Sequence, residues 1–206
     1  MAHSCGHSHR EHEVKAGDDL GALYSLYTKI DTTKVQCLNE TDEGSGVKVF
    51  KAWQDRKDTQ YFVESDADEE LLFNIPFTGS VKLKGVILIG GEDDTHPSEM
   101  RLYKNRPAMS FDDAAAEADQ TFDLQPDHEG KLEYHTKVAR FSNVEHLSVY
   151  ITKNFGADTT KVYYIGLKGD FMQAHKHGVT ICTYEAKPNP ADHQAKEFQP
   201  NSYSVQ

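Results

Sequence analysis

The clearest pattern in the chain is an alternation of apolar residues in the middle of the sequence. At a spacing of two, one face of an extended segment carries Val81, Leu83, Gly85, Ile87 and Ile89. The other face begins with lysines and becomes apolar towards its end. Successive side chains of a β-strand point to opposite faces, so this segment is predicted to be a strand. Because it starts half exposed and ends buried on both faces, it is typical of an inner strand of a sandwich.

Shorter segments with strand character lie on both sides of this one. They cover residues 35–38, 60–64, 71–78, 100–104, 134–141, 144–152, 161–167 and 179–184. Polar segments that favour loops separate them, at 39–46, 90–98 and 122–130. Pro76 falls inside one of the strand segments and has no N–H to donate to a ladder. We therefore expect an edge or a bend at Pro76.

Helical signals are few. Asp18 and Asp19 precede apolar residues at helical spacing, which predicts a short amphipathic helix near residues 18–27. Ser110 is a candidate N-cap with Asp113 three residues later, and this pair predicts a second short helix. Many short strands with one or two short helices indicate an all-β fold, most simply a jelly-roll β-sandwich.

The two ends of the chain differ in composition from its centre. Residues 1–19 are polar and rich in histidine, and the segment from residue 187 onward has three prolines and few apolar side chains. We expect one β-sandwich domain at 20–192, between a flexible N-terminal tail at 1–19 and a flexible C-terminal tail at 193–206. The N-terminus has no apolar segment typical of a signal peptide, and no apolar run is long enough to span a bilayer.

Charge narrows the classes of partner. The formal net charge is −11 and the sequence pI is about 5.4. Such a chain repels phosphate backbones and anionic lipid, so neither nucleic-acid binding nor membrane binding is expected. The three cysteines, Cys5, Cys37 and Cys182, are odd in number and irregular in spacing, which favours a reducing compartment over a disulfide framework.

The densest group of metal-ligand side chains lies in the N-terminal tail. It consists of His3, Cys5, His7, His9 and His12. Imidazole and thiolate suit Zn²⁺, and a flexible tail can wrap around an ion. No fixed second shell is available to orient the rings, so only weak zinc binding is expected, and the alternative is a solvated polar tail. No other cofactor is expected.

A second histidine pair suggests a metal site in the domain. Gly169, His175 and His177 match the start of a cupin-type motif, G-x5-H-x-H. Residues at i and i+2 of a strand share a face, so the two imidazoles can converge on one ion. The glutamate that should follow is missing, because Ile181 and Cys182 stand at its positions. The alternative is a polar hairpin end.

The other chemical candidates each have a structural alternative. Cys37 and Cys182 stand beside apolar residues and are expected in the core rather than as nucleophiles. The acidic runs at 66–70 and 92–94 offer carboxylates for Ca²⁺ without EF-hand spacing, which favours solvated loops or a charged docking surface. Trp53, the single tryptophan, is the candidate for stacking a sugar, although its apolar neighbours favour packing.

Long ordered stretches of the chain resemble a known family. They are FVESDADEELLFNIPFTGSVKLKGVILIG (62–90), PSEMRLYKN (97–105), MSFDD (109–113), RFSNVEHLSVYITKNFGADTTKVYYIGLKG (140–169) and YEAKPNPADH (184–193). These stretches resemble the PITH domain, the C-terminal module of a proteasome-associated thioredoxin-like protein. The resemblance implies a galactose-binding-like jelly roll, association with the regulatory particle of the 26S proteasome, and a location in cytoplasm and nucleus. It supplies no catalytic residues.

The sequence reading is therefore a non-enzymatic interaction module, expected to be a monomer, that docks on the 26S regulatory particle and modulates its activity. Loops at one end of the sandwich would form the contact, and acidic loops favour a partner with a basic surface. Two alternatives remain open. One is a metal-binding β-barrel protein or enzyme using His175 and His177, and the other is a carbohydrate- or small-ligand-binding sandwich.

Overall fold

The computed structural model describes residues 22–172. The two tails, His175, His177 and the strand expected at 179–184 lie outside these residues. The chain divides into two units, Met1–Ala174 and His175–Gln206, and the described residues all belong to the first. No helix in 22–172 is long and apolar enough to cross a membrane.

The described residues form an antiparallel β structure with short helical turns. The strands are β1 (Gln36–Leu38), β2 (Val63–Glu64), β3 (Leu71–Gly90), β4 (Pro97–Lys104), β5 (Gln120–Asp123), β6 (Tyr134–His135), β7 (Val144–Asn154) and β8 (Lys161–Met172). The helical elements are η1 (Tyr27–Lys29), η2 (Gly46–Val49), η3 (Trp53–Asp55), η4 (Asp93–Thr95) and α2 (Phe111–Ala114).

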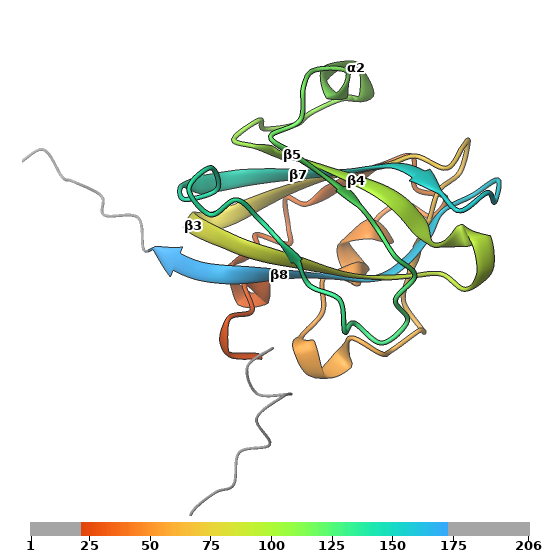
Figure 1. The fold of residues 1–206 in the computed structure, drawn as a ribbon, viewed down its shortest axis with the longest axis horizontal. Helices are drawn as coiled ribbons and strands as arrows, with labels where there is room; N and C mark the ends of the chain where they lie inside the picture. Colours follow the sequence, from red (N-terminus) through yellow and green to blue (C-terminus); the bar gives the residue numbers. More distant parts are fainter. Residues whose placement is uncertain (1–21, 173–206) are drawn as a thin grey trace, which may run out of the picture. The chain divides into compact units, whose positions relative to one another are not determined.

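Strand β3 belongs to both layers of the sandwich. Its first arm pairs with β1 and β7, and its second arm pairs with β8 and β6. The register shifts between Pro76 and Val81, where the strand doubles back near the β3 label in Figure 1. One layer is therefore β1-β3-β7-β4-β5 and the other is β2-β8-β3-β6.

The bend expected at Pro76 is confirmed, and the two strands expected around it are one continuous strand. Pro76 pairs with His146 of β7, and its carbonyl accepts a hydrogen bond from the Asp31 N–H at 2.9 Å. Proline offers no N–H to a second neighbour, so the ladder changes partners just after it. This bend turns one long strand into the edge where the two layers join.

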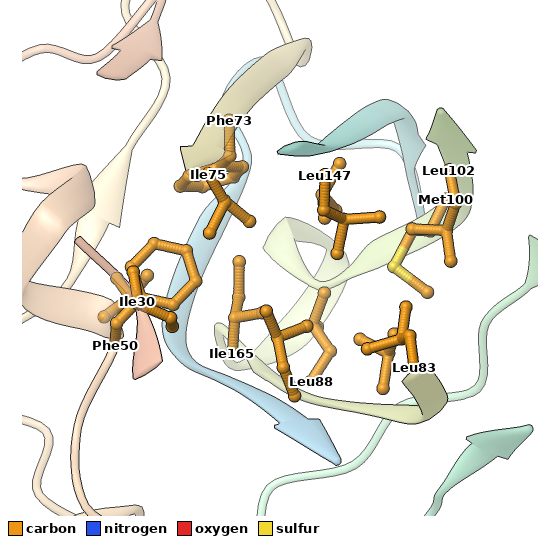
Figure 2. Packing of buried hydrophobic residues seen from close by; sticks show 14 of the residues in the cluster. Ile30, Phe50, Phe73, Ile75, Leu83, Leu88, Met100, Leu102, Leu147 and Ile165 are labelled. Carbon is orange, nitrogen blue, oxygen red and sulfur yellow. The ribbon is translucent and has the colours of Figure 1, made fainter. Parts of the chain in front are cut away.

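The main core fills the space between the layers. Figure 2 shows Phe73, Ile75 and Leu147 of one layer facing Leu88 and Ile165 of the other. Each of these side chains is at most 2% exposed. Burial of this apolar surface is the main stabilising contribution to the sandwich.

The alternation predicted for 81–89 holds only in part. Val81 and Leu83 point into the main core as expected, but the register shifts between Leu83 and Gly85. After this bulge it is Val86 and Leu88 that enter the main core. Ile87 and Ile89 pack in a separate cluster with Trp53 and Tyr164. The extra residue of a bulge flips the side-chain alternation, and this part of β3 is buried on both faces as predicted.

Local signals elsewhere are confirmed to different degrees. Helix α2 begins after Ser110 with a complete capping box, in which Ser110 Oγ accepts from Asp113 N–H and Asp113 Oδ2 accepts from Ser110 N–H. Strand β5 was not expected as a strand, and β6 is much shorter than the segment predicted at 134–141. Both errors concern segments whose pairing partners are distant in sequence.

Candidate functional site

One end of the sandwich gathers five loops. Both arms of β3 point to this end, away from the bend at Pro76. The loops are 39–45, 65–70, 91–96, 124–130 and 155–160, and we call them together the acidic end. The connections that meet at one end of a sandwich commonly carry its function, because the strands hold them rigidly.

The acidic end contains many carboxylates and no lysine or arginine. Its acidic residues are Glu40, Asp42, Glu43, Asp66, Asp68, Glu69, Glu70, Glu92, Asp93, Asp94, Asp127, Glu129 and Asp158. The negative charges of this end alone are at least as many as the net charge of the whole chain, which is −11. The remainder of the chain is close to electrical balance.

Hydrogen bonds connect each of these loops to its neighbours. The Asp66 N–H donates to the Asn39 carbonyl at 3.0 Å, and Thr160 Oγ1 donates to the Glu69 carbonyl at 2.6 Å. The Phe155 N–H donates to the carbonyl of Asp94 at 3.1 Å. These bonds link distant segments into one surface, which lowers the entropy lost when a partner binds.

Several of the carboxylates serve the loops themselves. Glu40 accepts from the N–H groups of Gly44 and Gly46, both at 2.6 Å. Asp127 is buried and accepts from three backbone N–H groups at 2.7 to 2.9 Å. Asp68 accepts from Asn39 Nδ2 at 2.7 Å. These contacts stabilise the loop conformations, although Asp68 also remains exposed to solvent.

Most of the other carboxylates face solvent, whereas Glu69 and Glu70 are half-buried and Glu129 is paired with Lys57 and Lys131. Asp42, Glu43, Asp66, Glu92, Asp93, Asp94 and Asp158 are exposed, and no ion pair within residues 22–172 involves any of them. Asp93 has a φ of 56°, a left-handed conformation that is uncommon outside glycine. Together these side chains form a negatively charged surface suited to a basic partner.

His96 holds the 91–96 loop against the 124–130 loop. Its side chain is buried, with Nδ1 lying 2.7 Å from the Pro97 carbonyl and Nε2 accepting from the Asp127 N–H at 3.1 Å. This arrangement requires a neutral ring with the proton on Nδ1. Burial lowers the pKa of His96, and the neighbouring His128 contributes in the same direction. With both nitrogens engaged, His96 supports the loops and is not placed to act as a base.

Trp53 is packed rather than presented on the surface. Its side chain is 8% exposed, and its ring meets Tyr164 edge-on at a centroid distance of 6.5 Å. The Arg56 guanidinium lies 3.9 Å from the ring centroid and Lys168 Nζ lies 5.2 Å from it. Both cations lie over the ring, where the π-system attracts them. A sugar has no open Trp53 face on which to stack.

Cys37 lies partly buried against the main core, where the sequence placed it. Its Sγ is 3.9 Å from the Leu38 carbonyl, and the carboxylate of Glu40 lies near enough to act on the thiol. Burial raises the pKa of Cys37, with a smaller contribution from the charge of Glu40. Because the thiolate is the reactive form, this burial disfavours a role for Cys37 as a nucleophile.

The remaining candidates from the sequence either lie outside the described residues or are not arranged to hold a metal ion. The N-terminal cluster of His3, Cys5, His7, His9 and His12 lies outside the described residues, as do Cys182, His175 and His177. Within 22–172, no group of three or more His, Cys, Asp or Glu side chains is arranged to hold a metal ion, and that includes the acidic runs at 66–70 and 92–94.

Asn74 is a structural feature that the sequence reading missed. It stands on the outer face of β3, where it is 6% exposed, and its side chain is hydrogen-bonded to Met109 and Ser148. The sequence feature that could have revealed its role is the position of this amide at the centre of the apolar run Leu71–Phe77. A buried amide needs partners, so its presence indicated a segment packed across that face.

Comparison with known proteins identifies the family. Residues 17–188 match the PITH domain. The chain belongs to the PITH domain family. PITH domain-containing protein 1 of Xenopus laevis is 60% identical over 98% of both chains, and the human protein of that name is 58% identical over the full length of both. The relative in Dictyostelium discoideum is 40% identical, again over both full lengths.

Solved structures resemble this PITH domain in fold alone. The CBM32-1 and CBM32-2 domains of Clostridium perfringens ZmpB, in complex with GalNAc, align with a TM-score of 0.54 over 74% of this chain and 38% of that one. The sequence identity is 10%. The galactose-binding-like sandwich is therefore confirmed, and at such low identity the sugar ligand belongs to that protein only.

Proposed function

We propose that this PITH domain protein is a non-enzymatic interaction module that docks on the regulatory particle of the 26S proteasome and modulates its activity. The acidic end is the observation that carries the proposal. Family membership and the resemblance to the module of a proteasome-associated protein support it. The corresponding location is cytoplasm and nucleus.

The acidic end has the properties of a docking surface for a basic partner. Its exposed carboxylates, such as Asp42, Glu92 and Asp158, project from loops that hydrogen-bond to one another. Complementary charge speeds encounter and suppresses wrong partners, whereas rigid loops limit the entropy cost of binding. The same charge disfavours nucleic acid and anionic membrane surfaces.

Two of the described reactive groups support a non-enzymatic role. Cys37 is a thiol with a raised pKa, and His96 uses both ring nitrogens inside the fold. Catalytic acids, bases and nucleophiles are usually accessible to a substrate and have pKa values poised near neutral pH. We further propose that the protein acts as a monomer and needs no cofactor, with only weak zinc binding by the N-terminal tail.

Capture of purified 26S proteasome tests the function. The tagged full-length chain is immobilised beside a version lacking residues 1–19, and bound subunits are identified by mass spectrometry. Recovery of regulatory-particle subunits by both chains, decreasing as salt is raised, is the expected result. Recovery of none by either chain contradicts the proposal. Recovery by the full-length chain alone would transfer the docking role to the N-terminal tail.

A further inference from the structure

A small pocket lies on the outer face of the layer that contains β1, β3 and β7, away from the acidic end. It has a volume of about 190 Å³. Its walls include Lys34, Asn74, Pro76, Arg106, Ala108 and His146. Gln36 of β1 and Ser148 of β7 pair with Asn74 in the same row across the sheet, so the pocket floor is fixed by the sheet itself.

The loop that closes the pocket is held in one conformation. Asn74 Nδ2 donates to the Met109 carbonyl at 2.9 Å, and the Met109 N–H donates back to Asn74 Oδ1 at 3.1 Å. At the other end of the loop, Asn105 Nδ2 donates to the Asn143 carbonyl at 2.8 Å, and Asn105 Oδ1 accepts from the Glu145 N–H at 2.8 Å. The loop 105–109 is thus anchored at both ends.

The same loop contains a strained backbone position. Ala108 has a φ of 53°, in the left-handed region that costs an L-residue with a Cβ about 1–2 kcal/mol. Ala108 is exposed and lines the pocket. Strained residues persist where the surrounding structure holds them, and they are concentrated at binding sites. The strain agrees with a preformed binding wall.

The pocket is positively charged in a protein that is acidic overall. The cations Lys34 and Arg106 line it, and no aspartate or glutamate does. Two carboxylates that interact with these cations already have other partners or are held by one of them: Asp31 Oδ2 lies 2.8 Å from Lys34 Nζ, and Asp113, whose pKa the charge of Arg106 helps to lower, belongs to the capping box of α2. A ligand with a carboxylate is therefore the one that this lining complements.

Both cations can still take up a ligand. The side chain of Lys34 is 73% exposed, and an exposed ion pair such as that with Asp31 exchanges partners at little cost. The Arg106 guanidinium lies 5.0 Å from the centroid of the Tyr103 ring, and Nη2 makes one long bond of 3.4 Å to the Glu117 carbonyl. Most of the five guanidinium donors are not used by these contacts.

Size decides between a small-molecule ligand and a peptide side chain. Sites for drug-sized ligands are typically about 300–1,000 Å³, and this pocket is smaller. Its apolar walls, formed by Ile75, Pro76, Pro107 and Ala108, suit the methylene stem of a side chain. A C-terminal residue would have to place its own side chain and its carboxylate in the same small space, so a side chain from a passing segment fits better.

We propose that this pocket binds an aspartate or glutamate side chain presented by an extended segment of a partner protein. Lys34 and Arg106 receive the carboxylate, and the loop 105–109 forms the wall against its stem. The inference deepens the proposed docking function, because it names the chemistry of a second contact. Only the identity of the biological partner rests on the proposed function. Binding of an acidic peptide is a property of the pocket itself.

Peptide titration of the full-length chain tests the inference. The probe is an acetylated and amidated pentapeptide with glutamate between glycine pairs, followed by NMR of the ¹⁵N-labelled protein. We expect saturable shifts of the Met109 and His146 amides and of the Asn74 side-chain amide. The matching glutamine peptide and a pentaglycine with a free C-terminus should not produce them. Equal shifts with the glutamine peptide, stronger binding of the free-acid peptide, or no shifts at all would overturn the proposal.

Variants separate the pocket from general attraction to a charged peptide. The double variant Lys34→Gln/Arg106→Gln should bind the glutamate peptide about tenfold more weakly, the loss of roughly one charge-assisted hydrogen bond. Lys137→Gln removes an exposed cation that does not line the pocket and should bind as wild type. If the double variant does not fold, Lys34→Gln alone gives the test, because Lys34 is exposed. Equal binding by all variants rules the pocket out.

The peptide assay and proteasome capture can fail separately. A chain that captures the regulatory particle but ignores the glutamate peptide overturns the pocket and leaves the proposed function standing. A chain that binds the peptide through Lys34 and Arg106 but captures no proteasome overturns the proposed function. The pocket would then stand as a binding site for an acidic segment of a different protein.

Discussion

Asn74 and Met109 are joined by two hydrogen bonds across 35 residues of sequence. The amide of Asn74 thus pairs with the backbone of Met109 much as a neighbouring strand would. Ser148 of β7 completes the arrangement by donating to Asn74 Oδ1 at 2.9 Å. One polar side chain therefore ties β3, β7 and the loop 105–109 together under the small cluster around Tyr103.

Replacing Asn74 should destabilise the domain strongly. In Asn74→Ala the Met109 N–H and carbonyl and the Ser148 hydroxyl lose partners inside the protein, and we expect a loss of about 2–4 kcal/mol in the free energy of unfolding. Ser148→Ala removes one donor and should cost about 1 kcal/mol. Urea unfolding of both variants measures the difference. A smaller loss for Asn74→Ala than for Ser148→Ala would contradict the role given to this amide.

Neutralising the acidic end should weaken docking on the proteasome. Glu92→Gln/Asp94→Asn removes two exposed charges, and we expect a several-fold slower association and a weaker dependence on salt. The matched control is Asp112→Asn/Glu117→Gln, two exposed acids near α2. Surface plasmon resonance with purified 26S proteasome gives both rates. Equal slowing by the two pairs would show that overall charge, and not this surface, governs association.

His96 should make stability depend on pH in the mildly acidic range. Its folded pKa lies below the ordinary value of 6.5, so the unfolded chain binds the proton more readily. The contribution of His96 to stability is therefore complete above pH 6.5 and is lost as the pH falls from there towards the folded pKa. Denaturant titrations at several pH values should show a shallower loss for His96→Gln than for wild type. His135→Gln, at a side chain that is 78% exposed, should follow the wild type; parallel curves for all three proteins would refute the assignment.

Trp53 should report a packed environment. It is the single tryptophan, so the tryptophan emission of the folded chain comes from this ring alone. With 8% exposure its emission is expected at short wavelength, shifting to longer wavelength on unfolding. Galactose should leave the folded spectrum unchanged, because the cations of Arg56 and Lys168 lie over the ring. A saturable spectral change with galactose would revive the carbohydrate-binding alternative.

The sequence by itself determined the local features of this protein. The alternation at 81–89 predicted a strand, Pro76 predicted a bend, and Ser110 with Asp113 predicted the start of α2. Each depends on geometry within a few residues: the period of an extended chain, the missing N–H of proline, and the reach of a side chain to the next turn. The family resemblance also came from the sequence, through its long ordered stretches.

Only the tertiary structure decided how distant segments meet. The bulge after Leu83 places Leu88 in the main core and Ile87 in the separate cluster with Trp53. The pairing of β3 with β8 sets this register, and the alternation in the sequence cannot reveal an extra residue. Strand β5 forms because β4 offers it a partner, and its own residues signalled a loop. The acidic end and the pocket beside Ala108 likewise depend on strands that bring separate loops together. Such pairings join residues far apart in the chain, and no local pattern encodes which ones will meet.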